Sequence, residues 1–187
     1  MSRIPVFGDR DSVPRRLAGL IFLDAVIYPD ARFGVGFRYA GPGHLKADTY
    51  LYDLGVPDVP DRLDAPQVLE WFSAARNEVT TLARQGKYLD LEIRDDATAL
   101  YIPEDATTPL CLCTRFSYRQ AAGSGIDFNG KRVSHLALRT DRGYINKIRY
   151  TYPDTDEFRE TGQAGFILFL SEWTSAVQDF GEAPSRS

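Results

Sequence analysis

Residues 131–152 read KRVSHLALRTDRGYINKIRYTY and form the most strongly patterned stretch of the chain. Two runs rich in Val, Ile, Leu, Thr and Tyr alternate in character, and the tripeptide Asp141-Arg142-Gly143 separates them. Alternation with a period of two is typical of a strand that is buried on one face. A three-residue loop ending in glycine is typical of a hairpin that closes on a G1 bulge. The stretch therefore predicts the central antiparallel hairpin of a sheet.

Further strands are expected on both sides of this hairpin. Alternating or β-rich segments that end at Gly, Pro or Asp predict strands at residues 20–28, 35–39, 47–53, 88–94, 100–102 and 110–119. In the segment 88–94, Leu89, Leu91 and Ile93 alternate with charged residues, so these three side chains are expected to face inward.

Two amphipathic helices are also expected. The first begins near Asp64, which has the capping-box spacing to Gln67, and it stops at Gly86. The second begins between residues 156 and 163 and ends at residue 180. Each helix carries apolar residues at steps of three and four, and their tryptophans, Trp71 and Trp173, are expected in the core.

Strands and helices in this order predict the α+β class, with one antiparallel sheet covered by two main helices. A length of 187 residues suits one domain that buries roughly two-thirds of the surface of its unfolded chain. We expect an extended arm at residues 1–16, a single α+β domain at 17–181 and a disordered tail at 182–187.

This arrangement resembles the PsbP-like fold, which the Mog and DcrB families share. The resemblance covers residues 20–180 and rests on the order of the elements and on two aromatic strands, GVGFRY at 34–39 and DTYLYD at 48–53. It implies an α/β/α sandwich that docks onto other macromolecules and has no shared catalytic site. No functional residue is carried over from it.

Composition and charge narrow the classes of partner. A formal net charge of -4 argues against binding to nucleic acid through the whole surface. The longest apolar run, residues 17–28, is interrupted by Asp24 and is shorter than the roughly 20 residues that span a bilayer. Asp9 and Asp11 stand where a signal peptide would be apolar, so the chain as written is expected in the cytoplasm, and in the periplasm if a signal was removed.

Two motifs suggest cofactors, and both are weak. Residues 125–131, GIDFNGK, match the start of a phosphate-binding P-loop, but Arg132 follows in place of Ser or Thr, and a strand follows in place of a helix. Cys111 and Cys113 could complete a zinc site with His44 and His135, although zinc-binding cysteines usually have two residues between them. We therefore expect no cofactor and no metal.

Catalytic arrangements are equally weak. His135 could act as a general base beside Ser117 on a neighbouring strand. Asp90 and Glu92 could act as a carboxylate pair, but they are more simply the solvated side of their strand. No catalytic residue is assigned, and an enzyme is not the favoured interpretation.

The register of the hairpin gives the favoured site. If Thr140 pairs with Tyr144, the basic residues of both strands lie on one face, opposite their apolar partners. The neighbouring strand adds two arginines, which gives a basic face made of Arg115, Arg119, His135, Arg139, Lys147 and Arg149. We expect a non-enzymatic binding or accessory protein that docks on an acidic macromolecular partner, or binds an anionic ligand, through this face. The alternative is a small-molecule binding protein or small enzyme with a cleft beside residues 121–130.

Overall fold

The computed structural model describes residues 13–94, 98–100, 109–121 and 128–179. Within them the strands are β1 (Arg16–Leu17), β2 (Leu20–Ile27), β3 (Val35–Ala40), β4 (Lys46–Tyr52), β5 (Tyr88–Ile93), β6 (Thr98–Leu100), β7 (Cys111–Gln120), β8 (Lys131–Asp141) and β9 (Tyr144–Pro153). The α-helices are α1 (Pro66–Arg84) and α2 (Asp156–Asp179), and two 3₁₀ turns are η2 (Ala31–Phe33) and η3 (Pro42–His44). The predicted α+β class is confirmed. The tail expected at 182–187 lies outside the described residues.

The strands form one antiparallel sheet in the order β1-β2-β3-β4-β9-β8-β7-β5, and β6 pairs with β7. The predicted hairpin, β8 and β9, occupies its middle. None of the helices in the described part of the chain is long and apolar enough to cross a bilayer.

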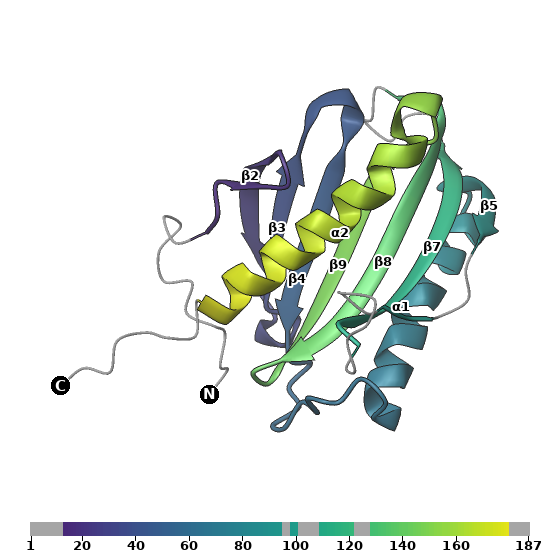
Figure 1. Ribbon diagram of the computed structural model, residues 1–187. Helices are drawn as coiled ribbons and strands as arrows, with labels where there is room; N and C mark the ends of the chain where they lie inside the picture. Colours follow the sequence, from purple (N-terminus) through teal and green to yellow (C-terminus); the bar gives the residue numbers. More distant parts are fainter. Residues whose placement is uncertain (1–12, 95–97, 101–108, 122–127, 180–187) are drawn as a thin grey trace.

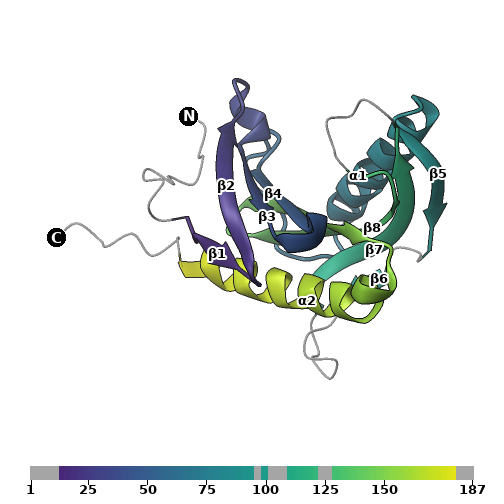
Figure 2. The same ribbon diagram turned by 90° about the horizontal axis from the view of Figure 1, so that it is seen from above.

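The two helices cover opposite faces of the sheet. Figure 1 shows α2 running diagonally across one face, with α1 behind the other. Figure 2 shows the sheet bent into a trough, with β2 to β4 rising on one side and β7 and β5 on the other. Helix α2 lies along the outside of this trough, and α1 lies inside it, next to β5. The side of the sheet inside the trough is called the concave face below.

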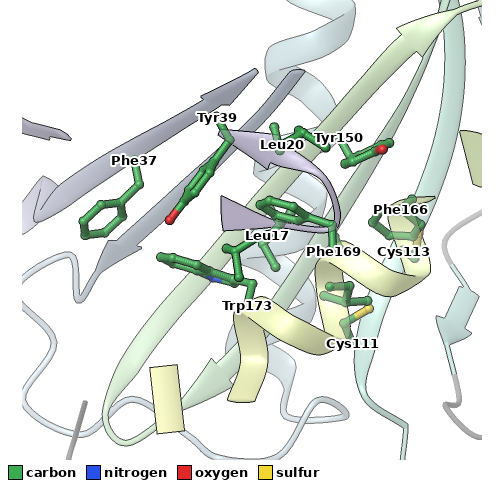
Figure 3. Close-up of a cluster of buried hydrophobic side chains, with 14 of the residues drawn as sticks. Leu17, Leu20, Phe37, Tyr39, Cys111, Cys113, Tyr150, Phe166, Phe169 and Trp173 are labelled. Carbon is green, nitrogen blue, oxygen red and sulfur yellow. The ribbon is translucent and has the colours of Figure 1, made fainter. Parts of the chain in front are cut away.

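Helix α2 and the outer face of the sheet form the larger core. Trp173 and Phe169 point from the helix toward the aromatic side chains of β3, as Figure 3 shows. The ring centroids of Trp173 and Phe37 are 5.3 Å apart, and those of Phe169 and Tyr39 are 5.6 Å apart. The predicted apolar stripe of the second helix is thus confirmed. The aromatic rings packed between α2 and the sheet show that the outer face is part of the hydrophobic core.

Helix α1 forms a second core with only part of the concave face. Val68, Phe72, Ala75 and Val79 pack on apolar residues of β7, β8 and the start of β9. The rest of the concave face, toward β2, β3 and β4, is not beneath a helix (Figure 2). This half of the trough holds the polar residues discussed below.

The loop of the central hairpin is shorter than predicted, and this corrects the register. Asp141 pairs with Tyr144, so the loop consists of Arg142 and Gly143 alone, with φ angles of 52° and 81°. Two residues with positive φ are typical of a type I′ turn, which closes a hairpin without a bulge. The prediction that Thr140 pairs with Tyr144 is wrong by one residue. Because side chains alternate along a strand, every side chain of β9 moves to the opposite face.

Two local predictions also fail. Asp64 does not cap α1: the N-cap is Ala65, and Asp64 forms an ion pair with Arg62 instead. In β5 the pairing with β7 shifts between Leu89 and Glu92, which breaks the alternation. Leu89 and Ile93 are consequently exposed rather than inward.

Candidate functional site

Four side chains of alternating charge lie in a row across the concave face. Asp24 on β2 pairs with Arg38 on β3, and Arg38 pairs in turn with Asp48 on β4. Asp48 pairs with Arg149 on β9. Residues that pair directly across antiparallel strands point to the same face, so the four form one row, called the charged rung below. Two acids and two bases balance within it.

The first pair of the rung shows how an arginine holds a carboxylate here. Arg38 donates from Nε to Oδ1 of Asp24 at 2.6 Å and from Nη2 to Oδ2 of the same carboxylate. Nε and Nη2 lie on one edge of the guanidinium, and two parallel bonds from this edge match a group with two oxygens.

Arg149, at the other end of the rung, is held by side chains of the protein. Its Nε donates to Oγ of Ser134 at 3.1 Å and its Nη2 to the hydroxyl of Tyr118 at 3.4 Å. Its guanidinium also lies over three aromatic rings, those of Tyr88, Phe116 and Tyr118, at 5.1 to 5.7 Å from the centroids. Burial lowers the pKa of Arg149, but the neighbouring tyrosines and Asp48 outweigh it, and the net shift is upward. The guanidinium is therefore charged and held in place.

Arg132 on β8 differs from Arg149. Only 1% of the residue is exposed, yet its Nε and Nη2 have no hydrogen-bond partner among the described residues. Its guanidinium lies 5.1 Å from the centroid of the Phe128 ring. Burial lowers the pKa of Arg132, because desolvation disfavours the charged form. Buried polar groups in proteins are nearly always hydrogen-bonded, so this unused edge calls for a partner.

Arg132 and the charged rung line one cavity of about 410 Å³, called the charged cavity below. Among the described residues it carries four cations, Arg38, Lys46, Arg132 and Arg149, against the two carboxylates of the rung, and these leave an excess of two positive charges. The remaining lining residues are Leu23, Tyr39, Ala40, Tyr50, Tyr88, Tyr118, Gln120 and Thr151. Electrostatically the cavity favours an anion.

Asp48 contributes an acceptor to this cavity. Burial raises the pKa of its carboxyl, and the nearby charges of Arg149, Lys46 and Arg38 oppose that shift. Among the described residues no group donates a hydrogen bond to it. The charged cavity is thus lined by Asp48, an acceptor without a donor among the described residues, and by Arg132, whose unused donor edge has almost no exposed surface.

A second cavity of about 560 Å³ adjoins the first, because Tyr50 lines both; we call it the aromatic cavity. Its other lining residues are Tyr28, Phe33, Tyr52, Leu54, Trp71, Ala74, Ala75, Glu78 and Lys147. Lys147 places its Nζ 5.0 Å from the centroid of Tyr50 and 3.2 Å from Oε2 of Glu78. Trp71 is half-buried here, whereas Trp173 is fully buried as predicted.

The basic face inferred from the sequence does not exist as one surface. Lys147 and Arg149 lie on the concave face, because the shorter loop reverses the facing of β9. The other four predicted residues lie on the outer face, with α2: Arg115, Arg119, His135 and Arg139. The physical reason is the positive φ of Arg142, which lets two residues close the hairpin.

The four residues on the outer face have partners there. Arg139 donates to Thr174 of α2 at 3.1 Å and forms an ion pair with Asp141. Arg115 donates to Gln163 of α2 at 3.4 Å. Arg119 forks onto Asp90 of β5, with Nε 2.6 Å from Oδ2. Most of this positive charge is used to attach α2 and β5.

His135, the fourth of these residues, is part of the core under α2. Its ring stacks on Phe166 at 4.4 Å, and its Nε2 is 3.2 Å from the hydroxyl of Tyr152. Burial, with a smaller effect from the charge of Arg115, lowers its pKa to about 3. A neutral histidine enclosed in this way makes a poor solvent-facing binding group.

The other chemical candidates have simple structural roles. Cys111 and Cys113 are buried in the outer core, and burial raises the pKa of Cys111. Glu92 accepts from Lys131 at 2.9 Å and from Ser117 at 3.4 Å. In the described part of the chain no cluster of three or more His, Cys, Asp and Glu could hold a metal. Part of the P-loop-like segment, residues 125–127, lies outside the described residues.

Comparison of the chain with family models, with curated proteins and with solved structures finds no match.

Sequence reasoning missed most residues of the charged cavity. Asp24 was a usable signal, because it is a lone acid in a strand that is otherwise apolar. Arg132 gave no such signal, since it reads as one more basic residue at the start of β8. Its importance comes from two buried nitrogens that have no hydrogen-bond partner in the described part of the chain, which depends on tertiary structure.

Proposed function

We propose that the protein is a non-enzymatic binding protein, and that the charged cavity holds the carboxylate or phosphate group of its ligand. The observation that carries this proposal is Arg132, a buried guanidinium whose Nε and Nη2 have no partner in the described part of the chain. Leaving a charge buried and unpaired costs several kcal/mol. Nε and Nη2 have almost no exposed surface, so a ligand anion supplies the missing counter-charge only by displacing the side chains that cover this edge.

Geometry and charge both support an anion with two oxygens. The unused edge of Arg132 consists of the same two nitrogens that Arg38 uses to fork Asp24 in the same cavity. The described lining of the cavity also has two more cations than carboxylates. Among the described lining residues there is no serine, cysteine or histidine, and the rung carboxylates lie beside arginines rather than beside a base, so we favour binding over catalysis.

Calorimetric titration of the full chain with inorganic phosphate, and separately with acetate, tests the proposal. Arg132→Gln should weaken binding of these anions at least about tenfold, because a hydrogen bond to a charged group contributes about 1.5–3 kcal/mol. Arg119→Gln is the matched control: it removes the same charge from an exposed ion pair outside the cavity and should leave affinity unchanged. Equal affinity in wild type and Arg132→Gln, or no binding by wild type at millimolar anion, contradicts the proposal.

Docking on an acidic macromolecular partner is the other proposal. It now relies on cations divided between two faces, of which Arg139 and Arg149 are engaged by the protein's own side chains. The excess of positive charge inside a cavity, rather than on an open surface, makes a small anion the better-supported ligand.

A further inference from the structure

The lining residues of the charged cavity other than Arg132 indicate which class of ligand it binds. This step rests on the proposed function and concerns the part of the ligand next to its anionic group. Asp48 lies in the same cavity and has no hydrogen-bond donor among the described residues. Asp48 is half-buried, so a ligand that displaces water from its carboxylate needs a donor as well as an anion.

The donor that meets Asp48 should be uncharged. Three cations act on the Asp48 carboxylate, those of Arg149, Lys46 and Arg38, and the Asp24 carboxylate opposes them in part. An ammonium group placed beside Asp48 would be repelled by all three, whereas a hydroxyl group would not. Hydroxyl groups are therefore the donors that the electrostatics of the cavity accept.

The rest of the lining suits a hydroxylated ring. Thr151 and Gln120 offer further polar groups, and the Tyr50 and Tyr88 side chains combine a ring with a phenolic hydroxyl. The volume of about 410 Å³ lies at the small end of the range of about 300–1,000 Å³ seen for ligand pockets, which suits one ring with an acidic substituent.

We propose that the charged cavity binds an anionic carbohydrate, either a uronic acid or a sugar phosphate, with its acidic group on Arg132 and a ring hydroxyl donating to Asp48. The adjoining aromatic cavity does not suit the acidic group, because Glu78 stands beside its one ammonium group, that of Lys147. The acidic group and the ring hydroxyl of the ligand thus both bind in the charged cavity.

A matched series of probes tests the two halves separately. Glucuronate carries a carboxylate and ring hydroxyls, cyclohexanecarboxylate carries the carboxylate alone, and glucose carries the hydroxyls alone. Calorimetric titration of the full chain should give a glucuronate affinity at least about tenfold above either of the others, since one satisfied polar group is worth about a factor of ten. Glucose 6-phosphate against glucuronate then distinguishes phosphate from carboxylate.

Two substitutions assign the effect to named residues. Asp48→Asn should reduce the ratio of glucuronate to cyclohexanecarboxylate affinity, while cyclohexanecarboxylate itself binds equally well or better because a negative charge is gone. Asp48→Ala provides a second variant in which no side-chain acceptor is left. Arg132→Gln should weaken both acids.

The outcomes separate this inference from the proposed function. If cyclohexanecarboxylate binds as tightly as glucuronate and glucose 6-phosphate no more tightly than inorganic phosphate, the carbohydrate assignment is wrong and the anion site stands. If none of these anions binds the wild type, both proposals are wrong. Binding of glucose as tight as that of glucuronate would also overturn the assignment, because the anion would then contribute nothing.

Discussion

Replacement of Arg132 by Met should lower the stability of the protein by at most about 2 kcal/mol, and should raise it where removal of the desolvated charge outweighs the lost ring contact. The residue is 1% exposed, and its Nε and Nη2 have no partner among the described residues. Methionine keeps much of the volume and the contact with the Phe128 ring, but removes a desolvated charge. Substituting buried charged groups by apolar residues of similar size is neutral or stabilising by about 1–4 kcal/mol. The lost cation–π contact offsets about 1–2 kcal/mol of this, so we expect the free energy of unfolding to change by about -2 to +3 kcal/mol.

Arg149→Met in the same cavity is the matched comparison, and it should destabilise the protein. This arginine loses its bond to Ser134 at 3.1 Å, its bond to Tyr118 at 3.4 Å and its contacts with three rings. It also leaves Asp48 buried with less positive charge nearby. Breaking a paired buried charge costs about 3–5 kcal/mol.

Urea denaturation followed by circular dichroism in an anion-poor buffer measures both free energies of unfolding. Added phosphate should stabilise the wild type by mass action and leave Arg132→Met unaffected. A loss of about 3 kcal/mol or more in Arg132→Met, equal to that in Arg149→Met, would refute the reasoning, because it is the cost expected for a guanidinium that is already paired.

Three further predictions concern the fold. Gly143→Ala should lower the free energy of unfolding by about 1–2 kcal/mol in thermal melts. The residue has a φ of 81°, which strains any residue with a side chain, and the added Cβ would meet no atom within 4 Å, so the whole loss would come from backbone strain. His135→Gln should remove a pH dependence. The unfolded state takes up a proton near pH 6.5 and the folded state near pH 3, so wild-type stability should fall by about 1.4 kcal/mol per pH unit below 6.5. Urea titrations between about pH 7 and pH 5 measure how the free energy of unfolding depends on pH, and an equal pH dependence in wild type and His135→Gln would contradict this prediction. Gly162→Ala should destabilise the protein by about 1–3 kcal/mol, although alanine has the better helix propensity, because the added Cβ would lie 2.5 Å from the Tyr152 ring. An unchanged denaturation midpoint would contradict the packing of α2 on β9.

The sequence predicted the elements of the fold well, because each long element carries its own periodic pattern. The apolar residues of α2, which include Phe169 and Trp173, recur at helical spacing, and they pack in the core as expected. The hairpin of β8 and β9 was located correctly, but its register depends on a single residue, Arg142. Arginine is not among the residues favoured at positive φ, so composition gave no sign of a two-residue turn.

The candidate site was harder to predict than the fold. Lys147 and Arg149 were recognised as site residues, yet their face was assigned wrongly because one residue of register reverses it. Trp71 was assigned to the core because helical spacing does not reveal that β2 to β4 leave a cavity beside α1. The charged rung joins residues from four strands, and a contact of that kind exists only after the sheet has formed.

Nuclear magnetic resonance of the arginine Nε–Hε groups tests the central claim most directly. Uniformly ¹⁵N-labelled full chain is titrated with inorganic phosphate, and the signal of Arg132 is assigned by its loss in Arg132→Lys. We predict that the Arg132 Hε resonance moves downfield as its unused edge binds the anion, whereas the signal of Arg38, which already forks Asp24, stays in place. An Arg132 signal that does not respond while phosphate binds, or one that already has the shift of a paired guanidinium, would contradict the account.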